Sequence, residues 1–103
     1  MDEQEFRRQS EAAIESLKKD LYAAEVSGDF EVEEQHGVLN VVFDEPPGKF
    51  VITPNTPVRQ IWISALATSF KLDWDGEKFA LQKTGEGLKE LVDRLVREHL
   101  EAV

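Results

Sequence analysis

The sequence contains no cysteine, which excludes disulfide bonds, thiolate metal sites and a cysteine nucleophile. Long apolar runs are also missing, since no stretch approaches the length that crosses a membrane. The first residues are acidic, whereas a secretion or transit signal would be basic. We therefore expect a protein without a membrane partner that resides in the cytoplasm, or in the mitochondrial matrix if it is a processed eukaryotic protein.

Motifs for covalent and phosphate chemistry are missing too. No serine lies in a glycine-flanked elbow, and His36 and His99 lack the spacing of a metal-binding pair. Gly85 and Gly87 do not belong to a G-x-G-x-x-G motif, so a phosphate-binding loop is not indicated. We expect neither nucleophilic catalysis nor a closed metal site.

The length and the charge define the class of protein. A chain of 103 residues with 41% hydrophobic residues predicts one globular domain that spans residues 1–103. The net charge is -9, and residues 1–34 contribute most of it, with eleven acidic and four basic residues. Residues 46–83 instead carry five basic and three acidic residues. Such a molecule should repel nucleic acid and attract cations or a basic protein at its acidic side.

Both ends of the chain have the periodicity of an amphipathic helix. From Asp2 to Ala24, apolar or small residues recur every three or four positions, and Gly28 is suited to end this helix. Thr84 is a candidate N-cap for a closing helix, with Glu86 in its first turn. The apolar stripe of that helix is Leu88, Leu91, Val92, Leu95 and Val96, and we expect His99 near its C-terminal end.

Between residues 29 and 82 the period changes to two, which is typical of strands. We expect strands that begin near residues 30, 38, 49, 60, 70 and 78. Turns are predicted at 36–37, 44–48, 54–57 and 75–76, and a loop at 65–69. The predicted fold is an α+β sandwich of two layers, in which both helices cover one face of an antiparallel sheet of five to six strands.

The segment from Gln60 to Ser64 is the most informative strand. Ile61 and Ile63 point toward the core, so Gln60, Trp62 and Ser64 point to the other face. A tryptophan in a domain of this size is commonly a core residue. The polar residues on either side of Trp62 favour a second interpretation, an exposed aromatic anchor for a protein partner.

Several of these segments together resemble the frataxin family. The resemblance rests on Gly37-Val38-Leu39 at the start of a strand, on the block from Pro57 to Ser64, on Asp73-Trp74 and on the two terminal helices. It covers nearly the whole chain. It implies a monomeric, iron-binding accessory protein of iron-sulfur cluster assembly, whose acidic side binds iron ions and a cysteine desulfurase and whose open sheet face meets the scaffold protein.

The resemblance also implies two sets of site residues. The carboxylates for weak iron binding (Fe²⁺ or Fe³⁺) are Glu11, Glu15, Asp20, Glu25, Asp29, Glu31 and Glu33. The partner-binding residues are Asn40, Thr53, Asn55, Gln60, Trp62, Ser64 and Lys71. The sequence departs from the family at Thr53, where an asparagine is usual, and in the first helix, where Lys18, Lys19, Tyr22 and Ala23 replace acids.

Three functional hypotheses follow. Surface carboxylates without thiolates suit hard cations such as iron, so the first is an iron donor or regulator that touches both the desulfurase and the scaffold. The second is a docking module in which metal is incidental, and the thinner acidic helix favours this mechanism. The third is an enzyme or store, a ferroxidase or iron-storage protein. Runs of surface acids are otherwise commonly just solvated.

Overall fold

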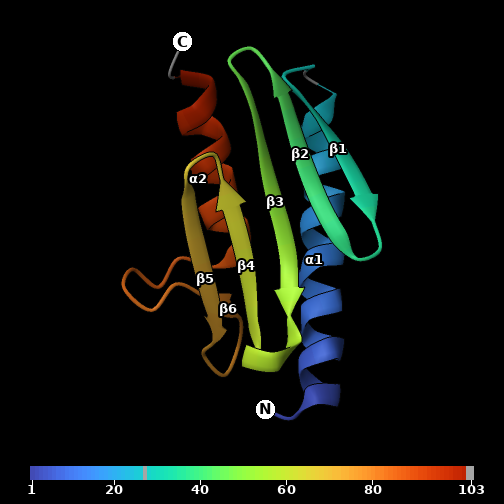
Figure 1. The fold of residues 1–103 in the computed structure, drawn as a ribbon, viewed down its shortest axis with the longest axis vertical. Helices are drawn as coiled ribbons and strands as arrows, with labels where there is room; N and C mark the ends of the chain where they lie inside the picture. Colours follow the sequence, from blue (N-terminus) through green and yellow to red (C-terminus); the bar gives the residue numbers. More distant parts are fainter. Residues whose placement is uncertain (27, 102–103) are drawn as a thin grey trace.

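The computed structural model describes residues 1–26 and 28–101. Two helices, α1 (Glu3–Glu25) and α2 (Leu88–Glu101), cover one face of a six-stranded antiparallel sheet (Figure 1). The strands are β1 (Phe30–Gln35), β2 (Val38–Asp44), β3 (Pro47–Asn55), β4 (Gln60–Ala65), β5 (Thr68–Trp74) and β6 (Phe79–Ala80), and a short 3₁₀ helix, η1 (Thr56–Val58), joins β3 to β4. Each strand pairs with its neighbours in the chain, in the order β1-β2-β3-β4-β5-β6. The predicted two-layer α+β sandwich is confirmed.

Helix α1 begins and ends close to its predicted limits. The Asp2 carboxylate caps the helix by accepting a hydrogen bond of 2.8 Å from the Glu5 N–H. After Glu25 the chain turns through Gly28, whose φ of 83° is in the left-handed region and whose N–H donates to the Glu25 carbonyl at 2.9 Å. The buried stripe of α1 is Phe6, Ser10, Ile14, Leu17 and Leu21.

The core lies between the helices and one face of the sheet. Strands β2 and β4 bury every second residue, as the alternation predicts. Strand β3 buries Phe50 and Ile52, and β5 buries Leu72. Ile61 and Ile63 are fully buried, and they lie opposite Leu72 and Phe70 of β5 in the register. The other residues of these strands form the open face of the sheet, which neither helix covers (Figure 1).

The prediction of a turn over 44–48 is wrong in its limits. Asp44 pairs with Pro47 and Phe43 with Gly48, so the turn consists of Glu45 and Pro46 alone, joined by a cis peptide bond. Pro47 is the first residue of β3, a position at which a strand tolerates proline.

The connector predicted at 54–57 is likewise shorter than expected. Pro54 and Asn55 belong to β3, opposite Ile61 and Gln60 of β4. A proline is accommodated there because β2 pairs with β3 only as far as Ile52, which leaves one edge of β3 open at Pro54.

The loop predicted over 65–69 is a two-residue hairpin turn. Ala65 pairs with Thr68, and Leu66 takes a left-handed backbone with φ of 58°. Turns of this kind are usually recognised by glycine or asparagine, which are missing here. The next hairpin, at Asp75-Gly76, is confirmed, but its second strand, β6, has two residues instead of five.

Thr84 is not the N-cap of α2, contrary to the prediction. Its hydroxyl accepts a hydrogen bond from the Glu86 N–H at 3.2 Å within a loop, and the helix begins only at Leu88. Glu86 therefore precedes the helix instead of lying in its first turn. Two backbone hydrogen bonds stabilise this loop. The Gly85 N–H donates to the Leu81 carbonyl at 2.8 Å, and the Leu81 N–H donates to the Glu86 carbonyl at 2.9 Å.

His99 lies in the last turn of α2, as the sequence predicted, and its side chain is buried. Only 7% of its surface is exposed, and its ring lies 4.4 Å from the Phe43 ring and 5.9 Å from that of Phe50. The ring nitrogen Nε2 lies 2.7 Å from the Pro46 carbonyl oxygen. His99 thus connects the last turns of α2 to the β2–β3 hairpin, because the hairpin places the Pro46 carbonyl oxygen within hydrogen-bond distance of its ring.

Candidate functional site: an aromatic patch on the open sheet face

Trp62 lies on the open face of the sheet, as the alternation predicted. Thr53 of β3 and Lys71 of β5 are its cross-strand neighbours. The adjacent row along the same face is Asn55, Gln60 and Asp73. Because β3, β4 and β5 are paired in register, these six side chains form one continuous patch.

The indole of Trp62 is held in place by Gln60 and Lys71, and Asp73 in turn holds Gln60. Its Nε1–H donates a hydrogen bond of 2.8 Å to Gln60 Oε1, and Gln60 Nε2 in turn donates to Asp73 Oδ1 at 2.9 Å. The ammonium of Lys71 lies 4.9 Å from the ring centroid, a cation–π distance. The ring is half-buried by these contacts and keeps part of its surface open to solvent.

A shallow hollow of about 380 Å³ lies beside the indole. Val51, Thr53 and Trp62 line it together with the hydroxyl-bearing side chains of Ser64 and Ser69. Such a surface can receive an apolar side chain of a partner and satisfy polar groups around it.

The structure brings six of the seven predicted partner-binding residues together in this area. Thr53, Asn55, Gln60, Trp62 and Lys71 form the patch, and Ser64 lines the hollow. Asn40 lies two strands away from Ser64, in the row Asn40, Val51, Ser64. Sequence reasoning missed Val51, Ser69 and Asp73, which become visible only through the register of the strands.

The predicted iron carboxylates are dispersed over several surfaces. Glu11 and Glu15 of α1 border a groove of about 650 Å³ toward the β1–β2 turn, together with Glu34 and His36. The Lys18 ammonium joins two of these carboxylates, at 2.9 Å from Glu15 and 3.4 Å from Glu34. Its hydrogen bond holds the pKa of the Glu15 carboxyl below the ordinary value.

Asp20 and Glu25 already have partners inside the fold. Asp20 forms an ion pair of 3.6 Å with Lys89 of α2, and the Glu25 carboxylate accepts a hydrogen bond of 2.6 Å from the Val32 N–H. Asp29 borders a different groove, between the ends of α1 and α2. Asp20, Glu25 and Asp29 therefore lie apart from Glu11 and Glu15.

Glu31 and Glu33 are exposed on β1 and alternate with the buried Phe30 and Val32. They project to the open face of the sheet, and neither forms an ion pair within the described residues. In residues 1–26 and 28–101, no three carboxylate or imidazole groups converge as ligands of one metal ion. The acidic side is thus an extended charged surface.

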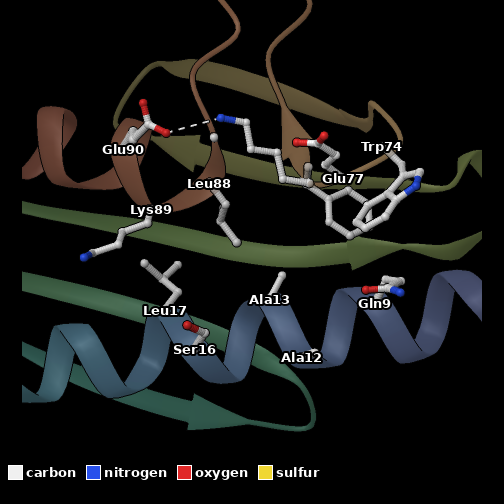
Figure 2. A pocket seen from close by; sticks show the side chains of 13 residues that line it. Gln9, Ala12, Ala13, Ser16, Leu17, Trp74, Glu77, Leu88, Lys89 and Glu90 are labelled. Atoms are coloured by element: carbon white, nitrogen blue, oxygen red, sulfur yellow. Dashed lines mark hydrogen bonds and ion pairs between the residues drawn. The ribbon is translucent and has the colours of Figure 1, made fainter.

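A further hollow, of about 360 Å³, separates α1 from the start of α2 (Figure 2). Small side chains of α1 such as Ala12, Ala13 and Ser16 leave this space open, and Leu17 and Leu88 form its floor. The Lys78–Glu90 ion pair of 3.4 Å crosses its rim.

In the part of the chain that the structure describes, no helix combines the length and the apolar character needed to cross a membrane.

Fold and surface together define an α/β sandwich with an acidic edge and an aromatic patch on its open sheet face. The chain belongs to the frataxin-like family, because the model of the frataxin-like domain matches residues 1–102. The resemblance seen in the sequence is thereby confirmed.

Named relatives agree with this assignment. The iron-sulfur cluster assembly protein CyaY of Pseudomonas entomophila is 33% identical over 88 residues, which are 84% of this chain and 78% of the relative. The CyaY protein of Pseudomonas putida is 32% identical over the same shares of the two chains.

Solved structures show the same fold. The frataxin of Psychromonas ingrahamii superposes with a TM-score of 0.77 at 19% identity, over 98% of this chain and 93% of that one. A trimeric frataxin of the yeast Saccharomyces cerevisiae, complexed with ferrous iron, gives a TM-score of 0.76 at 18% identity, over 90% and 86% of the two chains.

Proposed function

We propose that this protein is an accessory protein of iron-sulfur cluster assembly that docks proteins of the assembly machinery. Membership of the frataxin-like family and the names of its CyaY relatives support the pathway. The observation that carries the docking mechanism is Trp62, a half-buried indole fixed on the uncovered face of the sheet.

A tryptophan in this setting is suited to anchor a protein partner. Anchor residues of interfaces are enriched in tryptophan, and a side chain that is fixed before binding loses little conformational freedom on binding. The hydrogen bond to Gln60 and the ammonium of Lys71 provide this preorganisation. By family resemblance, the partner on this face is the scaffold protein on which clusters are assembled.

The acidic side is suited to a basic partner, for which the family resemblance suggests the cysteine desulfurase. Glu31 and Glu33 have no ion-pair partner within the described chain, whereas Glu15 and Asp20 are paired with lysines. The acidic edge β1 and the patch on β3 to β5 share the open face, so one assembly could engage both surfaces.

Iron is proposed as a weakly bound cargo of the same carboxylates. Carboxylate oxygens are hard ligands that suit iron ions, but the groups are dispersed and wet, so binding should be weak and sensitive to salt. Charged groups already paired with lysine must release that partner before they can bind iron.

Replacing Trp62 by alanine tests the docking role. We expect the affinity for the scaffold protein to fall by about 2 kcal/mol, or roughly thirtyfold, because an anchor residue is lost. The fold should tolerate the change, with a melting temperature close to that of the wild type, because the ring is only half-buried. Binding is measured by calorimetry and stability by thermal unfolding.

Tyr22→Ala is the matched control, because Tyr22 is an exposed aromatic residue on α1, in the other layer. It should bind the scaffold like the wild type. Unchanged binding of the Trp62 variant, or its severe destabilisation, would show that the indole serves the fold and not a partner.

A further inference from the structure

Strand β5 has an edge that is largely unpaired. The register between β5 and β6 contains only Asp73 with Ala80 and Trp74 with Phe79. Within the described residues, the segment from Thr68 to Leu72 therefore has β4 as its one neighbour strand. An unpaired edge presents backbone donors and acceptors that another chain can use.

The outward backbone groups of this edge can be assigned. Asp75 N–H donates across the edge to the Lys78 carbonyl at 2.9 Å. In an antiparallel strand every second residue points its N–H and C=O to the same side. Counting back from Asp75, the residues whose backbone groups point to this edge are Asp73, Lys71 and Ser69. Of these, Asp73 is already paired with Ala80. Ser69 and Lys71 thus offer their N–H and C=O groups outward.

A groove accompanies this edge. It measures about 520 Å³ and lies between β5 and the segment 81–84. Phe70 and Leu81, both half-buried, give it an apolar wall. Figure 1 shows the segment between β6 and α2, in orange, extending away from the sheet beside β5. An added strand could lie in this space with one row of side chains against the apolar wall.

The charges beside the groove select an acidic occupant. Lys71 and Lys83 are exposed and form no ion pair within the described chain, whereas Arg94 is already bound by Glu86 and Glu98. Asp73 also lines the groove, but its carboxylate accepts a hydrogen bond of 2.9 Å from Gln60, and it lies where β5 is already paired with β6. A second copy of this edge is disfavoured, because pairing two β5 strands brings the two Lys71 side chains into the same short ladder.

We propose that the edge of β5 binds an extended, acidic segment of a partner protein, which adds to the sheet as a further strand. Its backbone pairs with Ser69 and Lys71, its acidic side chains meet Lys71 on the open face, and its apolar side chains cover Phe70 and Leu81. This mode of recognition, β-strand addition, draws its affinity from main-chain hydrogen bonds and its specificity from alternate side chains.

A synthetic peptide tests the site without a protein of cluster assembly, so the result is independent of the proposed function. The probe is a capped peptide of about eight residues in which glutamate alternates with valine, so that each residue type lies on one face. Added to the ¹⁵N-labelled full chain, it should shift the amides of Ser69 and Lys71 and slow their hydrogen exchange at least about tenfold.

Two further peptides separate backbone pairing from charge. N-methylation of alternate residues on the pairing edge should abolish binding, because it removes the main-chain donors. Lysine in place of glutamate should weaken binding by about tenfold or more, because Lys71 then meets a like charge.

A matched pair of variants tests the same edge from the side of the protein. The N–H of Ser69 points away from β4, so Ser69→Pro removes an outward donor while the β4–β5 ladder is kept. We expect Ser69→Pro to lose at least about tenfold in peptide affinity and Ser69→Ala to bind like the wild type. Should Ser69→Pro fail to fold, the N-methylated peptide still decides the question.

Three results would overturn the proposal. They are no binding of the peptide at millimolar concentration, amide shifts confined to β1 or to the Trp62 patch, and equal binding by Ser69→Pro and Ser69→Ala. A fourth result would overturn it as well. If the protein forms dimers without peptide and the amides of Ser69 and Lys71 exchange slowly in them, the edge binds a second copy of the chain.

Discussion

At the scale of single residues, Gly48 and His99 show how closely the two layers meet. Gly48 faces the helices, and a Cβ atom built on it would lie 2.7 Å from Leu66 Cδ2 and 2.9 Å from His99 Cε1. Leu66 is exposed and can move away. The His99 ring is buried and held at the Pro46 carbonyl, so it cannot move without losing that contact.

We therefore expect Gly48→Ala to lower the free energy of unfolding by about 1–3 kcal/mol, the usual cost of overpacking. Chemical denaturation measures it. Lys49→Ala, an exposed neighbour on the same strand, is the control and should stay within about 0.5 kcal/mol of the wild type. Equal stability of all three proteins would show that the His99 ring yields easily.

These residues also mark what the sequence can and cannot predict. Trp62 could be placed because a period of two fixes which face a strand residue occupies. The burial of His99 and the need for glycine at position 48 arise from a contact between the end of α2 and the β2–β3 hairpin. About fifty residues of chain separate these partners, and no local pattern reports such a contact.

At the scale of elements, α2 is fixed to the loop before it by a charged clamp. Glu86 accepts hydrogen bonds from Arg94 Nε and Nη2 at 2.7 and 2.9 Å, and Arg94 also reaches Glu98 at 3.0 Å. These bonds hold the pKa of the Glu86 carboxyl below its ordinary value of 4.5. A lowered pKa in the folded state means that the carboxylate stabilises the fold above pH 4.5 and loses this effect as the pH falls through the folded pKa.

Glu86→Gln should therefore be less stable than the wild type at neutral pH. The difference should begin to shrink below pH 4.5 and vanish only when the pH is below the lowered, folded-state pKa of Glu86. Urea unfolding at a series of pH values measures this. Glu77→Gln changes an exposed glutamate that forms no ion pair in the described chain, and its stability should parallel the wild type throughout. A difference for Glu86→Gln that persists at low pH would assign the effect to lost packing.

The elements themselves were well predicted where periodicity is strong and poorly where turns lack marker residues. Helix α1 and strands β1, β2 and β4 begin within a residue or two of their expected positions. The Leu66-Ala67 turn contains neither glycine nor asparagine, so composition suggested a loop there. The start of α2 was misplaced because Thr84 matches a helix cap in sequence while its hydroxyl stabilises the preceding loop.

At the scale of the whole molecule, charge is separated across the sheet. The acidic α1 and β1 lie toward one edge, and Lys71 and Lys83 lie at the other, beside β5 (Figure 1). The sequence predicted this separation from its uneven charge, and the topology places β1 and β5 at distant positions in the sheet. The sequence could not predict that the seven carboxylates are dispersed, because their separation depends on how α1, β1 and α2 are placed relative to one another.

Reversing the charge of Glu31 and Glu33 to lysine should weaken binding of the cysteine desulfurase in metal-free buffer. We expect the association rate to fall by about tenfold at low salt, with little difference at high salt, because steering by charge is screened. Glu77→Lys with Asp93→Lys carries the same change of net charge on other surfaces and is the control. Unchanged desulfurase binding together with a loss of ferrous iron affinity would favour the iron-donor mechanism over docking.

The strand order has a consequence for how the protein is made. Because consecutive strands are neighbours in the sheet, each hairpin can close as soon as its second strand leaves the ribosome. One half of the helical layer, α2, is synthesised after all six strands. Until α2 is made, a growing chain that has paired its strands carries a sheet whose apolar side only α1 can cover.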